Sequence, residues 1–232
     1  MVHTTVYYSH KTRKSQVQIS EKAGFFRKNQ KKCRLSFTFR RKLGKVYVCV
    51  IRRERRYTMK TVKDYVTTIP DFPKPGIMFR DVTSVLQDGD GLCLAIDEMQ
   101  KKLEGVDFDI LAGSESRGFI FGMPLAYNLH KPFALIRKAG KLPREVIRHE
   151  CELEYGTTVL EMHKDDIKPG QKVVLVDDLI ATGGTMKACA EMVEELGGEV
   201  VKMLFLLELA GLEGRKLLKG YDVDSVVVYE GK

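Results

Sequence analysis

The sequence lacks the cysteine pattern of a disulfide framework or a zinc site. It has only five cysteines, an odd number, at positions 33, 49, 93, 151 and 189, and no two of them form a CxxC pair. This spacing argues against a disulfide-rich secreted protein and favours a reducing compartment, so we expect the protein to be cytoplasmic. The sequence also has no apolar run near the roughly 20 residues of a membrane-spanning helix, so we expect no membrane partner.

Acidic residues are scarce in the first quarter of the chain. Residues 1–58 contain 17 Lys and Arg against Glu21 and Glu54, whereas residues 59–232 carry a net charge of −7. We therefore divide the chain into a basic extension, 1–58, and a domain, 59–232. The extension is compatible with a nucleic-acid-binding arm or an organelle transit peptide.

We favour a third interpretation of the extension, in which it is not part of the native protein. Met59 opens the segment MKTVKDYV, which resembles a natural start, and the preceding RRERR is what a purine-rich ribosome-binding site encodes when it is translated in frame. Residues 46–51 have the composition of a strand, but charge on both sides of them predicts weak order.

The sequence contains neither a GK[ST] loop nor a GxGxxG fingerprint, so it lacks two common nucleotide-binding patterns. It has instead the run VVLVDDLIATGGTMKA at residues 173–188. Residues 173–176 are consecutively apolar, which indicates a strand buried on both faces of a parallel sheet. Asp177 and Asp178 are expected to end this strand. A glycine loop follows, and apolar residues between positions 186 and 196 recur at helical spacing.

The glycine loop has the composition of a phosphate site. Gly183 and Gly184 let the backbone approach a ligand, and the amides and positive dipole end of the next helix favour an anion. Thr182 and Thr185 add hydroxyl donors. Paired carboxylates accept hydrogen bonds from a sugar diol, so the run predicts a ribose 5-phosphate site. The alternative, a strand-to-helix turn with a solvated acidic pair, does not explain both aspartates and both threonines.

Strands and helices are expected to alternate along residues 59–232. We predict strands at residues 109–113, 132–136, 173–176, 200–207 and 223–229, and helices near residues 62–66, 92–103, 186–196 and 211–219 and from about residue 116. This order predicts an α/β fold with a mostly parallel central sheet flanked by helices. Three prolines and a glycine keep residues 69–81 extended. Residues 137–156 are highly charged, show no apolar face, and predict a solvated loop.

The run at residues 173–188 resembles the phosphoribosyl-diphosphate signature of the type I phosphoribosyltransferases. Three further motifs stand in the family's order, IPDFPKPGIMFRD at 69–81, SESRGF at 114–119 and RKAGKLP at 137–143. The first is similar to the hood over the base in the adenine-specific members, with Ile69 in place of their leading Phe. In the second, Glu115 stands where they usually have Asp. The resemblance spans essentially all of residues 59–230 and implies a type I phosphoribosyltransferase fold with a small hood and a mobile lid.

The resemblance implies an enzyme of purine salvage that transfers phosphoribosyl from 5-phosphoribosyl 1-diphosphate to adenine, giving AMP and pyrophosphate. It also implies Mg2+ carried in with the diphosphate, and a homodimer with no nucleic-acid partner. Two alternatives remain open. One is a transferase for another base, such as xanthine, hypoxanthine or orotate, against which the hood sequence argues. The other is a purine-sensing regulator that binds DNA through the basic extension, against which the lid motif and the acidic domain argue.

The resemblance also implies which residues hold the base. Phe79 stacks on adenine, and backbone groups around Met78 and Arg80 pair with its edge. Glu154 lies near N7 as a proton donor or orienter, with Tyr155 beside it in the substrate site. Because an unmatched buried donor or acceptor costs about 1 to 3 kcal/mol, such pairing can reject a 6-oxopurine.

The family assigns the remaining residues to the sugar and its two anionic groups. Water would capture a phosphoribosyl cation unless the lid closed over it, so the lid cations are expected to act during turnover. Catalysis is expected from Arg117, Lys138, Lys141 and Glu154. Binding of the diphosphate, ribose and 5-phosphate is expected from Ser116, Arg137, Asp177, Asp178, Ala181, Thr182, Gly183, Gly184 and Thr185.

Overall fold

The computed structural model describes residues 36–40, 48–52, 60–153 and 156–231, which belong to two units, Met1–Met59 and Lys60–Lys232. In the first unit, β1 (Ser36–Arg40) pairs antiparallel with β2 (Val48–Arg52). The strand predicted at residues 46–51 is confirmed for residues 48–51, which the structure describes. The weak order expected around this strand concerns residues that lie mostly outside the described ones. Within the described residues, no helix has the length and apolarity needed to cross a membrane.

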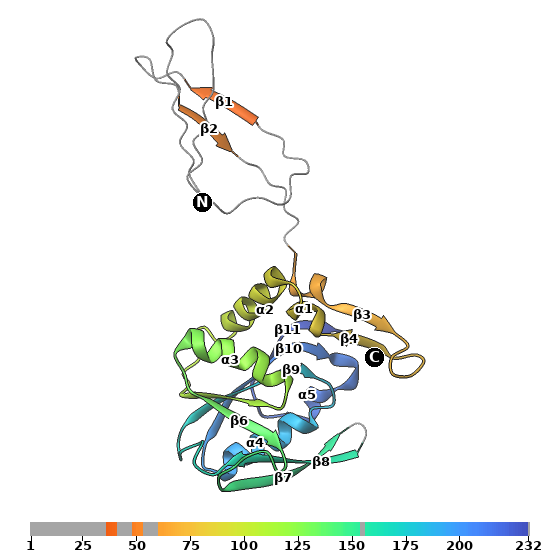
Figure 1. Cartoon of the computed structure of the whole chain (residues 1–232), viewed down its shortest axis with the longest axis vertical. Helices are drawn as coiled ribbons and strands as arrows, with labels where there is room; N and C mark the ends of the chain where they lie inside the picture. The colour runs from red at the N-terminus through yellow and green to blue at the C-terminus, as the bar shows by residue number, and fades with distance from the viewer. Residues whose placement is uncertain (1–35, 41–47, 53–59, 154–155, 232) are drawn as a thin grey trace, which may run out of the picture. The chain divides into compact units, whose positions relative to one another are not determined.

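The second unit is built on a seven-stranded sheet (Figure 1). Five parallel strands stand in the order β11, β10, β9, β5, β6, and β8 and β7 continue the sheet antiparallel. Their bounds are β5 (Ile110–Ser114), β6 (Phe133–Lys138), β7 (Val146–Leu153), β8 (Gly156–His163), β9 (Lys172–Ile180), β10 (Glu199–Leu209) and β11 (Val223–Tyr229). The strand order therefore reverses between β5 and β9, the place where open α/β sheets bind ligands.

Helices cover both faces of this sheet, as the alternation of strands and helices predicts. In Figure 1, α2 (Gly89–Lys101) and α3 (Arg117–Leu129) lie on one face and α4 (Gly184–Glu195) lies on the other. Because successive strand residues point to opposite faces, Val174 and Val176 of β9 pack with the α2 and α3 side, whereas Val173 and Leu175 pack with α4. All four are fully buried, which confirms the prediction of a strand covered on both sides.

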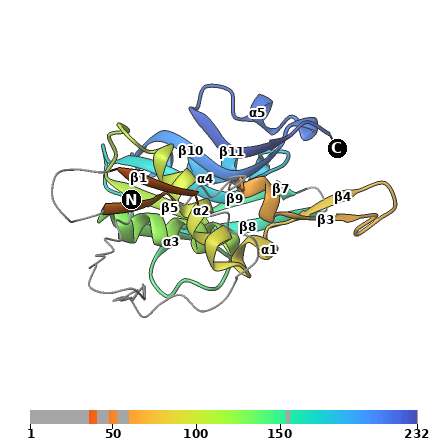
Figure 2. The ribbon, with the colours of Figure 1, turned by 90° about the horizontal axis from the view of Figure 1, so that it is seen from above.

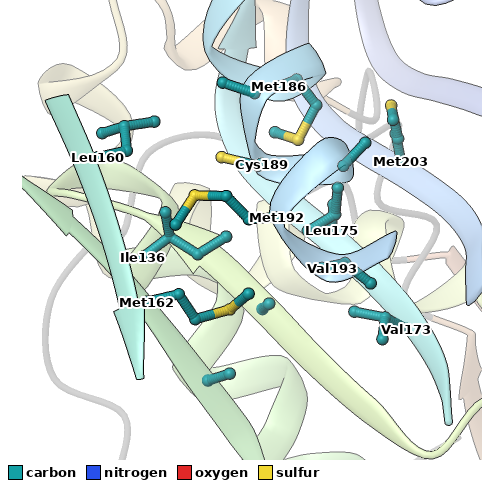
Figure 3. Packing of buried hydrophobic residues seen from close by; sticks show 14 of the residues in the cluster. Ile136, Leu160, Met162, Val173, Leu175, Met186, Cys189, Met192, Val193 and Met203 are labelled. Carbon is teal, nitrogen blue, oxygen red and sulfur yellow. The ribbon is translucent and has the colours of Figure 1, made fainter. Parts of the chain in front are cut away.

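The core under α4 is rich in sulfur-containing side chains (Figure 3). Met186, Cys189, Met192 and Val193 point from α4 toward the sheet and are at most 2% exposed. The helical spacing of Met186, Cys189 and Val193, together with Ala190 and Leu196, was the signal that predicted this helix. Met186, in the first turn of α4, belongs to the same core cluster as Ile180 at the end of β9, which holds the glycine loop between them in place.

A small hairpin precedes the sheet in the chain. It consists of β3 (Thr67–Pro70) and β4 (Met78–Asp81), paired antiparallel with Ile69 opposite Phe79. It lies between the 3-10 helix η1 (Val62–Tyr65) and the short helix α1 (Thr83–Leu86). Figure 2 shows the hairpin projecting from the body of this unit. The prediction that residues 69–81 are extended is confirmed for the two strands, but residues 71–77 between them form a turn in which Asp71 has a φ of 57° and Gly76 a φ of 86°. Residues 67–81 are here named the hood.

Three sequence predictions about the domain were wrong in part. The segment expected to be a solvated loop contains β7, because Ile147 and Cys151 alternate with charged residues at the period of an edge strand, with buried side chains at both positions. Strand β9 runs to Ile180, so Asp177 and Asp178 lie within it. The helix predicted at residues 211–219 is two short helices, η2 (Ala210–Leu212) and α5 (Gly214–Leu217), separated by a left-handed residue, Glu213.

An ion pair fastens α5 to the sheet. Nε and Nη2 of Arg215 lie 2.7 Å from the two carboxylate oxygens of Glu208, and the Ser225 hydroxyl donates to the same carboxylate at 2.8 Å. The hydrogen bonds from Arg215 and Ser225 outweigh burial and hold the pKa of Glu208 below its usual value. Glu208 is 6% exposed, so it depends on these partners.

We predict that Arg215→Ala lowers the free energy of unfolding by about 1 to 3 kcal/mol at neutral pH. Because the folded-state pKa of Glu208 is lowered, this stabilisation is complete above its unfolded pKa and is lost as the pH falls through the folded pKa, below the usual value of 4.5. Urea titrations at pH 7 and pH 3 measure both effects. Lys216→Ala, which removes the exposed pair with Glu213, is the control and should change stability by less than about 0.5 kcal/mol. Equal stability of the two variants at pH 7 would contradict the prediction.

Candidate active site

A cavity of about 350 Å3 lies where the strand order reverses, beyond the ends of β5 and β9. Its walls come from the segment after β5, from the end of β9, from the glycine loop and from β10. The lining residues are Ser114, Glu115, Ser116, Arg117, Asp177, Asp178, Leu179, Ile180, Ala181, Thr182, Gly183, Gly184, Thr185, Met186 and Phe205. The acidic pair and the whole glycine loop predicted from the sequence therefore share one cavity.

The glycine loop, residues 181–185, ends in the N-terminus of α4. Gly183 caps this helix with a φ of 86°, in the left-handed region where glycine is favoured. A Cβ atom at this position would also lie 2.7 Å from the carbonyl oxygen of Gly214. The first amides of a helix have no intrahelical acceptor and carry its positive dipole end. The loop therefore presents backbone donors to the cavity at the point where a phosphate fits.

The two aspartates differ in their surroundings. The carboxylate of Asp177 accepts hydrogen bonds from the Ser114 hydroxyl at 2.5 Å and from the Asp178 amide at 2.9 Å. Asp178 has its Oδ2 atom 2.8 Å from Nε of Arg117, but this buried oxygen accepts no hydrogen bond of good geometry from the described residues. Burial raises the pKa of both carboxyls. For Asp177 the neighbouring Asp178 raises it further, and for Asp178 the Arg117 guanidinium opposes the rise.

The turn after β5 brings Arg117 to the cavity. Ser116 caps α3, which begins at Arg117, and the peptide between Glu115 and Ser116 is cis. A Cβ atom at Gly118 would lie 2.7 Å from the carbonyl oxygen of Val176. Only glycine lets the start of α3 approach β9 this closely, and this contact sets Arg117 beside the acidic pair.

Two basic residues, Arg137 at the end of β6 and Lys141 just after it, meet at Glu115 on the edge of the cavity. Nε of Arg137 lies 3.2 Å from Oε2 of Glu115, Lys141 forms an ion pair with Oε1, and the Lys138 amide donates to Oε2 at 3.2 Å. Burial opposes ionisation, but these partners hold the pKa of Glu115 below its usual range. Arg137 and Lys141 reach the cavity wall through this carboxylate and do not line the cavity themselves. The Lys138 side chain is exposed.

Comparison with known proteins identifies the family. The phosphoribosyl transferase domain family matches residues 84–229. An adenine phosphoribosyltransferase from Agathobacter rectalis is 75% identical over 174 residues, which are 75% of this chain and the whole length of that relative. One from Lachnoclostridium phytofermentans is 63% identical over the same shares. The crystal structure of adenine phosphoribosyltransferase from Thermoanaerobacter pseudethanolicus superposes with a TM-score of 0.70 at 52% identity, covering 72% of this chain and 98% of that one.

The chain belongs to the adenine phosphoribosyltransferase family. The similarity confirms the predicted fold class, a mostly parallel sheet flanked by helices, and the predicted transferase activity. The roles of individual side chains stay predictions. The cavity contains the acidic pair, the glycine loop, Ser116 and Arg117, but not the predicted base-binding residues of the hood.

In an adenine phosphoribosyltransferase the hood is expected to hold the base, but its residues stand apart from the cavity here. Met78, Phe79 and Arg80 do not line it. The Phe79 ring makes an edge-to-face contact with Phe72, with ring centroids 5.1 Å apart. The Arg80 side chain donates to the Thr68 hydroxyl at 2.5 Å. Glu154 and Tyr155 lie outside the described residues.

Sequence reasoning missed two residues that shape the site of this phosphoribosyltransferase, Phe205 and Gly214. It placed Gly118 of the SRGF motif in an anion-binding turn but did not predict its close approach to β9. Phe205 lines the cavity from β10 within an apolar run that carries no local signal. Gly214 packs on the glycine loop, since a Cβ there would lie 2.3 Å from the Ala181 carbonyl oxygen. Nothing in the sequence links positions 181 and 214, because only the fold brings them together.

We predict that Gly183→Ala raises the KM for 5-phosphoribosyl 1-diphosphate more than tenfold, because the new methyl group displaces the loop from Gly214. Gly105→Ala is a matched control, since Gly105 has a similar φ of 78° but open space around its Cβ position. Both variants should lose about 1 to 2 kcal/mol of stability from the left-handed backbone. Only the first should lose diphosphate affinity in steady-state kinetics. An unchanged KM in a folded Gly183→Ala enzyme would show that the loop does not hold the phosphate.

Proposed function

We propose that this chain transfers the phosphoribosyl group of 5-phosphoribosyl 1-diphosphate to adenine in purine salvage, releasing AMP and pyrophosphate. The observation that carries the proposal is one cavity holding an acidic pair, an Arg-bearing turn and a glycine loop at a helix N-terminus. Relatives support adenine as the base. The yeast enzyme, 37% identical, was solved with adenine, and the Giardia lamblia enzyme, 34% identical, with 9-deazaadenine. No finding favours another base or a DNA-binding regulator.

The sugar phosphate is held between the acidic pair and the glycine loop. The amides of residues 181–185 and the hydroxyls of Thr182 and Thr185 bind the 5-phosphate at the positive end of α4. Asp177 and Asp178 accept hydrogen bonds from the ribose hydroxyls. Fixing both ends of the sugar aims its anomeric carbon at N9 of the base, and this orientation supplies part of the rate.

The departing pyrophosphate is stabilised by cations at the other end of the cavity. Loss of the diphosphate leaves positive charge on the sugar and builds negative charge on the leaving oxygens, so fixed cations favour the transition state. Arg117 and Ser116 lie in the cavity wall, and Arg137 and Lys141 reach its edge at Glu115. Lys138 lies beside them at the end of β6, with an exposed side chain. Closure of residues 137–156, here named the lid, would bring these cations onto the substrate and exclude water.

The base is held by the hood and by the end of the lid. Phe79 stacks on adenine while backbone groups at Met78 and Arg80 pair with its edge, and Glu154 and Tyr155 approach N7. Phe79 and Phe72 already form an aromatic pair on the hood. Because Met78 is 40% exposed and Phe72 is 49% exposed, the hood presents apolar surface that a planar base can cover.

Mg2+ is proposed to enter with the diphosphate. The described residues include no cluster of three or more His, Cys, Asp or Glu that could hold a metal ion, which suits a cation whose ligands come mainly from substrate oxygens and water. The carboxylates of Asp177 and Asp178 line the cavity, and the buried Oδ2 of Asp178 suits such a cation. The metal would neutralise charge on the diphosphate.

Residues 1–58 are proposed to be dispensable for this activity, and the protein is proposed to work in the cytoplasm. The Agathobacter rectalis relative aligns over its whole length with 174 residues of this chain, which is the length of the segment 59–232. All residues that carry the proposed chemistry lie within that segment. The proposal separates the basic extension from catalysis.

The protein is also proposed to be a homodimer through α3. Ile120, Met123 and Tyr127 stand on one face of this helix, with exposed fractions of 39%, 50% and 81%. An apolar stripe of this size is typical of a contact surface. We propose a second copy of the chain as the partner. Because α3 begins at Arg117, a partner packed on this helix would also steady the pyrophosphate turn.

The decisive experiment mixes the protein with adenine, 5-phosphoribosyl 1-diphosphate and Mg2+ and measures AMP. We predict equal activity for the full chain and for residues 59–232, and a loss of at least about a hundredfold in kcat/KM for the double variant Asp177→Asn with Asp178→Asn. Asp97→Asn, an exposed change on α2, is the control. Near-normal turnover of the double variant would refute the assignment, as would full activity with hypoxanthine and none with adenine.

The same double variant should melt at a higher temperature than the wild type at pH 8. The folded-state pKa values of both aspartates are raised, so ionisation above the usual value of 3.8 destabilises the folded, empty protein. Replacing the carboxylates by amides removes that penalty. The difference should vanish at low pH, where the wild-type carboxyls are protonated, and thermal melts at pH 8 and pH 4 compare the two. A lower melting temperature at pH 8 would contradict the expectation.

We predict that Met123→Glu converts the dimer to a monomer, because a charge replaces an apolar side chain at the centre of the α3 stripe. Leu217→Glu on α5 is the matched control, since Leu217 is also 50% exposed but lies away from α3. Sedimentation velocity measures the outcome. A wild-type monomer, or a dimer that survives Met123→Glu, would place the contact elsewhere.

A further inference from the structure

A buried carboxylate that does not line the cavity lies beneath the start of the lid. Glu161 belongs to β8 and is 1% exposed. Its register partners are Arg137 on β6 and Arg148 on β7, so it stands between two cations on one face of the sheet. The neighbouring residues of β8, Leu160 and Met162, point to the opposite face and belong to the core under α4.

Glu161 holds the main chain of the lid turn. Its Oε2 atom accepts a hydrogen bond from the Gly140 amide at 2.8 Å, and its Oε1 atom lies 2.7 Å from Nε of Arg148. Hydrogen bonds from Arg148 and from the amides of Gly140 and Lys141 lower the pKa of Glu161, so the carboxylate is ionised at neutral pH. Gly140 has a φ of 81°, the left-handed conformation that glycine supplies at this turn.

The same turn carries a cation of the proposed diphosphate site. The Lys141 ammonium forms an ion pair with Glu115, which lines the cavity. Arg137 donates from Nη1 to the Lys141 carbonyl at 3.4 Å and pairs with Glu115 through Nε. Lys141 is thus held at two ends, through its backbone by Glu161 and Arg137 and through its side chain by Glu115.

We propose that Glu161 is a positioning residue for diphosphate binding. By fixing the backbone at residues 140–141 it keeps Lys141 and Arg137 within reach of the cavity edge, where the diphosphate replaces Glu115 as their partner. The inference rests on the proposed function and assigns Glu161 no contact with substrate. Its essential interaction is with the Gly140 amide rather than with Arg148, whose side chain is 65% exposed.

Three substitutions at one position separate the two interactions. Glu161→Gln keeps the length of the side chain and an oxygen that can accept from the Gly140 amide, but removes the charge that faces Arg148. Glu161→Asp keeps the charge but is one methylene shorter, so it cannot reach the amide without moving the turn. Glu161→Ala removes both. Glu150→Ala, an exposed carboxylate on the adjacent strand β7, is the control.

The measurement is the Kd for 5-phosphoribosyl 1-diphosphate with Mg2+ by calorimetry, together with the KM values for diphosphate and adenine. We expect Glu161→Asp and Glu161→Ala to weaken diphosphate binding about tenfold, as loss of one charge-assisted hydrogen bond does. Glu161→Gln and Glu150→Ala should stay within about threefold of the wild type. The KM for adenine should change in none of them. In a Lys141→Met background, Glu161→Ala should weaken binding by less than it does in the wild type, because one of the two side chains it positions is gone.

Several outcomes would overturn the inference. Wild-type diphosphate affinity in a folded Glu161→Asp enzyme would do so, as would weaker binding in Glu161→Gln than in Glu161→Asp. Equal changes in both KM values, or full additivity with Lys141→Met, would assign Glu161 a purely structural role. Calorimetry measures binding of the diphosphate without turnover, so this test does not depend on whether the protein forms AMP. A wild-type protein that binds the diphosphate but forms no AMP would refute the activity and leave the role of Glu161 measurable.

Discussion

The cost of burying two carboxylates at the end of the central strand is the constraint on which the site depends. Asp177 and Asp178 lie inside the sheet, where burial disfavours their charged forms. The protein offsets this cost only in part, with the Ser114 hydroxyl on one carboxylate and the Arg117 guanidinium near the other. In the proposed function, the two adjacent hydroxyl donors of the ribose offset the rest of this cost, so affinity for the sugar comes at the expense of stability.

Close approaches of backbone to backbone position the groups around that acidic pair. Gly118 lets α3 start against β9, and Gly183 and Gly214 let the glycine loop touch the segment before α5. At each place an added Cβ atom would lie within 2.7 Å of a carbonyl oxygen. The Glu208–Arg215 pair then holds α5 in place from the opposite side. The positions of the helix N-termini at α3 and α4 therefore depend on these close-packed glycines and on an ion pair outside the cavity.

Local patterns in the sequence predicted the parts of this molecule that local physics determines. The apolar run at residues 173–176 and the helical spacing of Met186 and Cys189 gave the central strand and α4, and the motif order gave the family. Strand β7 was missed because a polar residue, His149, stands between Ile147 and Cys151 on the buried face, and an edge strand needs only one buried face. The roles of Gly214 and Glu161 depend on neighbours distant in sequence or across strands, so no local pattern marks them.

Carboxylates among the cations of an anion site look counterproductive, since each repels the diphosphate. Their net effect on affinity depends on how mobile the Lys and Arg side chains would be without these carboxylates. Lys and Arg side chains left in water sample many rotamers, and ordering them on binding costs up to about 2 kcal/mol each. Glu115 and Glu161 hold Arg137 and Lys141 near the cavity before any ligand arrives. In the proposed function, the diphosphate is a multivalent anion that takes Lys141 from the single charge of Glu115, and it gains the ion pair without ordering the side chain anew. In the proposed function the two glutamates thus trade some attraction for preorganisation, and the Lys138 amide remains as a partner of Glu115 when the cations move to the diphosphate.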